Sequence, residues 1–152
     1  MRRQPSILLL ALAATVAFAA APALARSGLF TALRSSATTQ HGAFHGTLTV
    51  RRFKLQRGRL AAQVVLRGTV HDSRYPQDVT FHQPAAIPVQ LAGSGCRVTV
   101  SIGPARTFVW GLPASLRASR ALVTGSAGCR LHSARGASAQ VQALERLRRA
   151  RG

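Results

Sequence analysis

The feature that most constrains the fold is a run of alternating apolar residues from Phe44 to Val70. Alternation with a period of two is the pattern of a β-strand that buries one face. The run is interrupted once by the sequence Gln56-Arg57-Gly58-Arg59, in which the glycine is typical of a hairpin turn. The pattern therefore predicts two long antiparallel strands joined by a short turn.

The parity of the apolar positions changes at Arg51-Arg52, because Phe53 and Leu55 continue the series that Val50 ends. A one-residue β-bulge returns both side chains to the core face. With that bulge the apolar positions of the two strands face each other in these pairs: Leu55 with Leu60, Phe53 with Ala62, Val50 with Val64, Leu48 with Leu66, and Gly46 with Gly68.

Shorter strands are predicted beyond the hairpin, separated by prolines and glycines. Their expected ranges are 79–82, 87–91, 97–102 and 107–110. After Pro113 the sequence is ambiguous, but Leu122-Val123-Thr124 favours a last strand over a helix. We expect an all-β domain over residues 43–132, built as a small antiparallel β-sandwich or open barrel.

The segments on either side of this domain differ in composition. Residues 26–42 are rich in small and hydroxylated residues, so we expect a loose lead-in. Residues 133–152 form an Arg-rich tail whose helix-competent part offers only a narrow apolar stripe: Val141, Leu144 and Leu147. Such a helix is marginal in isolation. The tail is predicted to be a short basic helix or disordered, with a frayed tail preferred.

Residues 1–25 have the pattern of a cleaved secretory signal peptide, with a positive start and an apolar run over residues 7–21. Small residues precede the expected cleavage site between Ala25 and Arg26. An uncleaved membrane anchor is disfavoured, because the run is shorter than the roughly 20 residues that cross a bilayer. Export predicts a secreted, extracellular or cell-envelope-associated protein with no transmembrane segment in its mature chain.

Two cysteines are present, Cys96 and Cys129. In an oxidising compartment, two cysteines in a small secreted domain most often form a disulfide. Free thiols and a metal site are the alternatives, although neither cysteine belongs to a CxxC pair or adjoins a histidine.

The charge balance is strongly basic: 21 Lys and Arg residues stand against 3 acids, for a formal net charge of +18. Such an excess attracts anionic surfaces. Arginine binds phosphate and carboxylate bidentately, so we predict anion binding where basic residues are densest, around the bulge and the hairpin turn: Arg51, Arg52, Lys54, Arg57 and Arg59. The alternative is a solvated surface that only keeps the protein soluble.

Catalysis is not predicted. The only carboxylates are Asp72, Asp78 and Glu145, so a paired-acid mechanism could use only the two aspartates of one loop. His71 precedes Asp72, but the nucleophile elbow GxSxG is absent from the sequence.

No cofactor or metal site is predicted either. His41 and His45 are four residues apart, a spacing that binds metal on a helix, and here they adjoin a predicted strand. Tyr75 and Trp110 are isolated aromatics that offer no stacking platform, so specific nucleic-acid binding is not expected.

The segments Phe44-His45-Gly46-Thr47-Leu48-Thr49-Val50-Arg51-Arg52-Phe53, Gly58-Arg59-Leu60-Ala61-Ala62 and Gly68-Thr69-Val70 carry a family resemblance. They resemble small secreted proteins of high-GC Gram-positive bacteria built on a GTLTVxRF-type hairpin. That family continues with a cysteine, a Gly-Pro and a second cysteine, as do Cys96, Gly103-Pro104 and Cys129 here. The resemblance covers residues 43–129 and is weaker after the hairpin, where Arg106, Thr107, Arg117, Ser119 and Arg120 replace leucines. It implies export, β-structure and a disulfide, and it supplies no catalytic residues.

These observations predict a secreted or envelope-associated, non-catalytic protein that binds anionic envelope polymers or lipids through an arginine-rich surface. The alternative function is a binding module that holds a small apolar ligand between its β faces. Such a cavity would be lined by residues such as Phe53, Val64, Val100 and Trp110.

Overall fold

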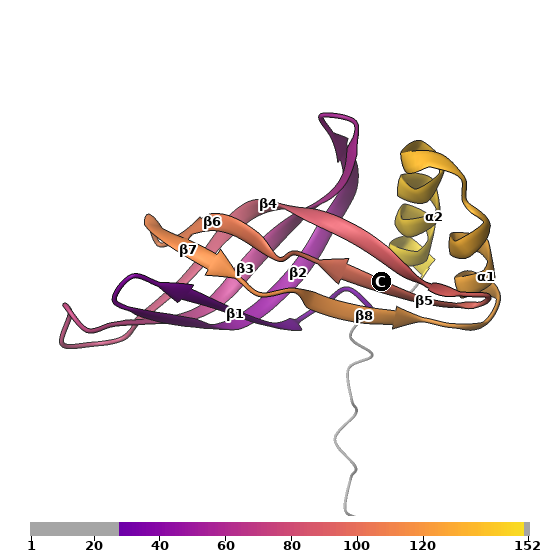
Figure 1. Cartoon of the computed structure of the whole chain (residues 1–152). Coiled ribbons are helices and arrows are strands. Elements are labelled where there is room, and N and C mark those ends of the chain that lie inside the picture. The colour runs from indigo at the N-terminus through magenta and orange to yellow at the C-terminus, as the bar shows by residue number, and fades with distance from the viewer. Residues whose placement is uncertain (1–27, 151–152) are drawn as a thin grey trace, which may run out of the picture.

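A computed structural model describes residues 28–150, and the predicted signal peptide with its cleavage site at Ala25 and Arg26 lies outside the described residues. Eight antiparallel strands form an open sheet in the order β6-β7-β1-β2-β3-β4-β5-β8, followed by two helices at one end (Figure 1). The elements are β1 (Leu33–Thr39), β2 (Gly42–Gln56), β3 (Arg59–Asp72), β4 (Val79–Ser94), β5 (Arg97–Ile102), β6 (Ala105–Val109), β7 (Leu112–Leu116), β8 (Ser119–Val123), α1 (Gly125–Ser133) and α2 (Gly136–Ala150). The all-β prediction with a short C-terminal helix is confirmed.

The central β2–β3 hairpin has the predicted register along its whole length. All five predicted pairs are observed, from Leu55 opposite Leu60 to Gly46 opposite Gly68, and the register shifts between Val50 and Arg52. The bulge is therefore confirmed at the predicted position. It brings Phe53 into the core, whereas Leu55 is left exposed because the end of the hairpin extends past the core.

The sheet rolls so that elements distant in the sheet order come together. Strand β4 pairs with β3 over Val79–Pro88 and with β5 from Val89 onward, which turns the sheet. Ser119 of β8 donates a hydrogen bond to the carbonyl of Arg34 in β1 at 2.8 Å. The buried faces of the strands thereby enclose one apolar core.

The hairpin strands approach closely where two glycines face each other. Gly46 lies opposite Gly68, and a side chain at Gly68 would meet the backbone of His45 and the ring of Phe44. Only glycine fits at these two positions, because any side chain would collide with the facing strand. The ring of Phe44, which contacts Phe81, lies next to this pair.

Two sequence predictions about the strands require correction. Residues 33–39 form β1 within the segment expected to be a loose lead-in, and β1 pairs with both β2 and β7. The predicted strands 79–82 and 87–91 are one strand, β4, which contains Pro84. Proline is tolerated there because this half of β4 pairs with a strand on one side only.

The C-terminal segment is ordered as helices. Residues 125–132, predicted to belong to the β domain, lie in a helix, α1. The Arg-rich tail, predicted to be a short basic helix or disordered, forms the helix α2, whose Leu144 and Leu147 are buried in the core. Packing against β2 and β3 supplies the stability that a helix this short lacks in isolation. The predicted disulfide between Cys96 and Cys129 is confirmed, and it joins the β4–β5 turn to α1.

Candidate anion-binding surface

The β2–β3 turn projects from the sheet (Figure 1). Pairing of β1 with β2 ends at Leu48, and pairing of β4 with β3 starts at Ala61, opposite Lys54. The turn end of the hairpin, residues 55–60, therefore has no strand on either side. Its turn residues Arg57 and Gly58 have φ angles of 51° and 72°, which are the left-handed values of a two-residue hairpin turn.

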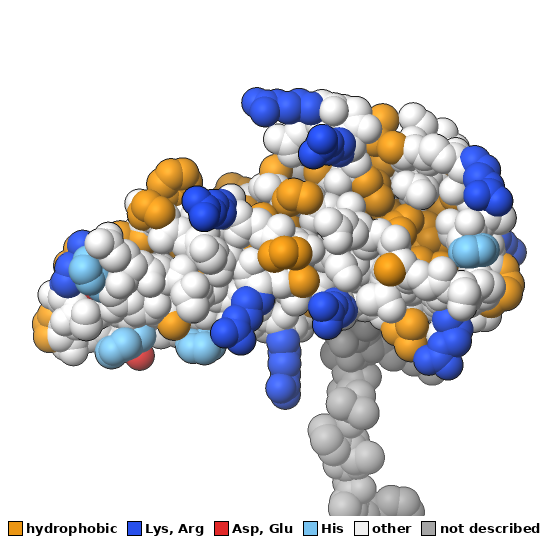
Figure 2. Space-filling view, in the orientation of Figure 1, with side chains coloured by type: hydrophobic (Ala, Val, Ile, Leu, Met, Phe, Trp, Pro, Cys, Tyr) orange, Lys and Arg blue, Asp and Glu red, His pale blue; other side chains and the backbone are white. Residues whose placement is uncertain are grey.

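Of the five predicted anion-binding residues, Arg57 and Arg59 lie on this projection, and Arg51, Arg52 and Lys54 precede it along β2. Arg51 and Arg52 are exposed at the bulge, Lys54 is half-buried, and Arg57 and Arg59 are exposed at the turn. Because side chains alternate along a strand, Arg52 and Lys54 lie on the face opposite to the buried Phe53. Figure 2 shows basic side chains standing out from the projecting hairpin.

An open hollow of about 640 Å³ adds a sixth cation to this group. Arg57, Arg59 and Arg106 all line it, together with small and apolar residues of β4 and β6. Sequence reasoning missed Arg106, because its proximity depends on how the sheet rolls. The arrangement offers several guanidinium groups to one anionic ligand. We call these six residues the basic tip: Arg51, Arg52, Lys54, Arg57, Arg59 and Arg106.

The carboxylates of the chain lie away from the basic tip or have partners of their own. Asp72, whose side chain is buried, accepts hydrogen bonds from Arg74 Nε and Nη2 at 3.0 and 2.8 Å and from the Arg74 backbone N–H at 2.9 Å. The side-chain hydrogen bond of Arg74 and then its backbone N–H lower the pKa of Asp72 to about 2. Asp72 therefore stays ionised at neutral pH.

Glu145 of α2 pairs with arginines of its own helix. Its carboxylate lies 2.9 Å from Arg148 Nη2 and 3.6 Å from Arg149 Nε, and it accepts the backbone N–H of Phe53. Burial raises the pKa of Glu145, but the hydrogen bonds from Arg148 and Phe53 outweigh it, so the pKa lies below its ordinary value. The third acid, Asp78, lies 2.7 Å from His71 Nδ1.

Each of the three acids is thus bonded to a residue outside the basic tip. Within residues 28–150 the cations of the tip form no salt bridge. Their charge is free to attract an external anion.

A second basic group lies on the outer face of the sheet. The strand register places Arg34, Thr47, Arg67 and His82 in one row across β1 to β4. The basic residues of this row come from separate strands, so no local pattern in the sequence indicates it. Strand β2 separates Arg34 from Arg67, and each of the two lines a different hollow. In the basic tip, by contrast, three arginines line the same hollow.

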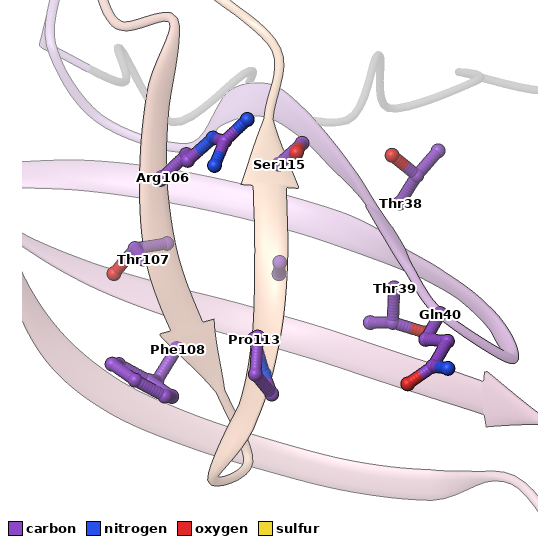
Figure 3. Close-up of a pocket in the computed structure, with 9 residues that line it drawn as sticks. Thr38, Thr39, Gln40, Arg106, Thr107, Phe108, Pro113 and Ser115 are labelled. Carbon is purple, nitrogen blue, oxygen red and sulfur yellow. The ribbon is translucent and has the colours of Figure 1, made fainter.

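A shallow hollow of about 660 Å³ lies over β1, β6 and β7 (Figure 3). Arg106 and Ser115 lie at one end, and Phe108 and Pro113 lie side by side near the β6–β7 turn. Arg106 lines both this hollow and the hollow at the basic tip. The basic tip is therefore continuous with the surface of the β6–β7 hairpin.

Tyr75 and Trp110, predicted to be isolated, form a pair. Their ring centroids are 5.5 Å apart in an edge-to-face arrangement, and the Arg74 guanidinium lies 5.8 Å from the Tyr75 centroid. The contact could not be predicted from the sequence, because it joins two segments that are distant in the chain, the β3–β4 loop and the β6–β7 turn.

The four residues suggested for an apolar ligand cavity do not all lie together. Phe53, Val64 and Val100 are buried in the core, whereas Trp110 is exposed at the β6–β7 turn. In the part of the chain that the structure describes, no group of three or more histidine, cysteine or acidic side chains is placed to hold a metal ion.

Comparison with known proteins gives no match: neither a family model, nor a curated protein, nor a solved structure resembles the chain significantly. The family resemblance of the hairpin therefore stays a prediction. No helix among the described residues has the length and apolar character needed to span a membrane.

Proposed function

We propose that this protein is a secreted or envelope-associated, non-catalytic protein that binds anionic envelope polymers or lipids through its arginine-rich surface. The observation that carries this proposal is the contrast between paired acids and unpaired cations. All three carboxylates bond to groups outside the basic tip, while Arg57, Arg59 and Arg106 converge on one open hollow.

The basic tip has the chemistry for this task. Guanidinium groups bind phosphate and carboxylate through paired hydrogen bonds. The short turn holds Arg57 and Arg59 close together, which limits the conformational freedom lost on binding. The disulfide between Cys96 and Cys129 fits an oxidising compartment outside the cytoplasm.

The test is binding of the chain from Arg26, which contains every described element, to long-chain polyphosphate and to vesicles of phosphatidylglycerol and phosphatidylcholine. We expect binding to both probes that falls steeply as sodium chloride is added, because salt screens exposed charges. Secretion is tested separately by the intact mass of protein from the culture medium, which should begin at Arg26.

Two variants that lose equal charge distinguish a site from a merely basic protein. The first replaces Arg51, Arg52, Lys54, Arg57 and Arg59 by alanine. The matched control replaces five exposed arginines on other elements by alanine: Arg97, Arg120, Arg130, Arg135 and Arg146. We expect the first variant to bind at least about tenfold more weakly than the control, or about 1.4 kcal/mol. Equal losses would mean that net charge alone governs binding and would overturn the proposed site.

A further inference from the structure

The β6–β7 hairpin separates apolar and basic residues along its length. Residues 107–116 contain no charged side chain, and Arg106 and Arg117 flank them. The register pairs Arg106 with Ser115 and Val109 with Leu112, so the flanking charges lie at the base and the apolar residues surround the turn. In so basic a chain, an uncharged exposed turn is a distinct surface.

This turn exposes two large aromatic side chains. Phe108 is 62% exposed and Trp110 is 40% exposed, and Tyr75 beside Trp110 is 45% exposed. Figure 2 shows hydrophobic side chains standing on the surface over this hairpin, next to a basic side chain. Contiguous exposed apolar groups with a polar rim are typical of interaction sites.

The fold holds Trp110 at the turn in an unfavourable backbone conformation. Its φ of 51° is the left-handed value, at a position of two-residue turns that favours asparagine, aspartate or glycine. Gln83 of β4 fixes it there: Gln83 Oε1 accepts the Trp110 N–H at 2.8 Å, and Gln83 Nε2 donates to the Phe108 carbonyl. The edge contact with Tyr75 supports the ring from the other loop. The same φ of 51° occurs at Arg57 in the β2–β3 turn, so it is the contacts with Gln83 and Tyr75 that distinguish Trp110.

We propose that the β6–β7 turn inserts Phe108 and Trp110 into the interfacial region of an anionic phospholipid bilayer, with Arg106 at the level of the lipid phosphates. Tryptophan and tyrosine favour the headgroup region, and arginine binds phosphate. This inference rests on the proposed function for the electrostatic attraction that brings the protein to an anionic surface.

The dimensions of the hairpin suit this placement. Trp110 lies four positions after Arg106, which corresponds to about 13 Å along a strand. Interfacial segments bury their apolar face by about 5–10 Å. When the turn is inserted to that depth, the Arg106 guanidinium remains near the phosphates and does not enter the hydrocarbon.

The surroundings of the aromatics favour lipid over sugar. A sugar site places hydrogen-bonding groups around its aromatic platform. At the end of the turn the neighbours of Phe108 and Trp110 are Leu112 and Pro113, and the amide of Gln83 is already bonded to the backbone. Hydroxyl and amide groups such as those of Thr38, Gln40 and Ser115 lie on the other side of Phe108, in the hollow over β1 and β7. Contact with hydrocarbon is therefore the better match for the end of the turn.

Trp110 is the only tryptophan of the chain, so the tryptophan fluorescence of the protein shows whether this side chain enters the bilayer. We would titrate the chain from Arg26 with vesicles of phosphatidylglycerol and phosphatidylcholine in equal parts and follow tryptophan emission and quenching by acrylamide. Cosedimentation measures binding in the same samples. The expected result is binding with a shift of the emission to shorter wavelength and reduced quenching, and neither change with phosphatidylcholine alone.

A matched pair of variants tests whether insertion contributes to affinity. Phe108→Ser removes an exposed ring at the turn and retains Trp110 as the reporter. Leu122→Ser is the control, because Leu122 is 47% exposed on β8. We expect Phe108→Ser to weaken partition into anionic vesicles by about tenfold and Leu122→Ser to leave it unchanged. Circular dichroism checks that both variants keep the sheet.

The outcomes separate this inference from the proposed function. Binding to anionic vesicles with unchanged Trp110 emission would overturn insertion and leave electrostatic binding intact. Trp110 emission that responds to polyphosphate but not to vesicles would overturn insertion in favour of a polymer site. Failure to bind either probe would overturn both proposals.

Discussion

Glu145 Oε1 accepts the backbone N–H of Phe53 at 2.5 Å, which joins the last helix to the central hairpin beside its bulge. Strand β1 stops pairing with β2 at Leu48, and the N–H of Val50 bonds to the carbonyl of Phe30. Beyond that point α2 takes the place of a neighbouring strand. A backbone donor at the edge of the sheet is satisfied by a side chain ninety-two residues away in the sequence.

Replacing Glu145 by alanine should therefore destabilise the protein. The variant leaves a half-buried N–H without its acceptor, which costs about 1–3 kcal/mol. Urea unfolding at neutral pH measures the change in the free energy of unfolding. Asp78→Ala is the control, because the exposed Asp78–His71 pair is expected to contribute only about 0–1 kcal/mol. Equal effects of the two substitutions would contradict the docking role of Glu145.

The hairpin could be predicted in detail because its information is local. Alternation fixed which residues face the core, and the change of parity at Arg51-Arg52 fixed the bulge. One buried face allows a single register, since a slip by one residue would expose every apolar side chain of the strand.

The remaining elements depend on contacts that the sequence does not encode locally. Strand β1 has small and polar residues, such as Ser35 and Ala37, on its buried face, so its pattern does not resemble a strand until β2 and β7 pair with it. Helix α1 has few apolar residues and is held by the disulfide and by Leu131 in the core.

The candidate site was predicted in part for the same reason. Five members of the basic tip belong to one hairpin and are close in the sequence. Arg106 joins them only because β6 lies beside β4 in the rolled sheet. The contact between Tyr75 and Trp110 likewise requires two separate loops to meet.

The Asp72–Arg74 pair predicts a defined loss of stability in acid. The pKa of Asp72 is about 2 in the folded protein, below the ordinary aspartate value of about 3.9. A carboxyl with a lowered folded pKa stabilises the protein above its unfolded pKa, and the contribution disappears as the pH falls through its folded pKa. The contribution should thus be complete above about pH 4 and lost toward about pH 2.

Asp72→Asn provides the comparison for this pH effect. The variant should be less stable than the unmodified protein at neutral pH, and the difference should shrink as the pH falls through that window. Thermal unfolding at a series of pH values measures the difference. A gap that stays constant with pH would show that ionisation of Asp72 does not contribute.

Gly68→Ala should destabilise the protein strongly, because the structure leaves no room for a side chain at this position. A Cβ at Gly68 would collide with the backbone of His45 and with the ring of Phe44, so the hairpin strands would have to separate. Overpacking of this kind costs about 1–3 kcal/mol or more. Gly58→Ala is the matched control: Gly58 has φ 72° but nothing near its Cβ position, so only the left-handed conformation costs about 1 kcal/mol. A smaller loss for Gly68→Ala than for Gly58→Ala in urea unfolding would contradict the close approach.

The disulfide should supply a large share of the stability of this domain. Cys96 and Cys129 are separated by 33 positions, and closing a loop of that size in the unfolded chain is worth about 3.5–4 kcal/mol in the chain-entropy model. The variant Cys96→Ser, Cys129→Ser should therefore unfold at a much lower urea concentration than the oxidised protein. Reductant should lower the midpoint of the unmodified protein towards that of the double variant and leave the variant itself unchanged. If the double variant and the oxidised protein unfolded at the same midpoint, the link between the β4–β5 turn and α1 would not constrain the unfolded chain, and packing of Leu131 would be sufficient to hold the helix.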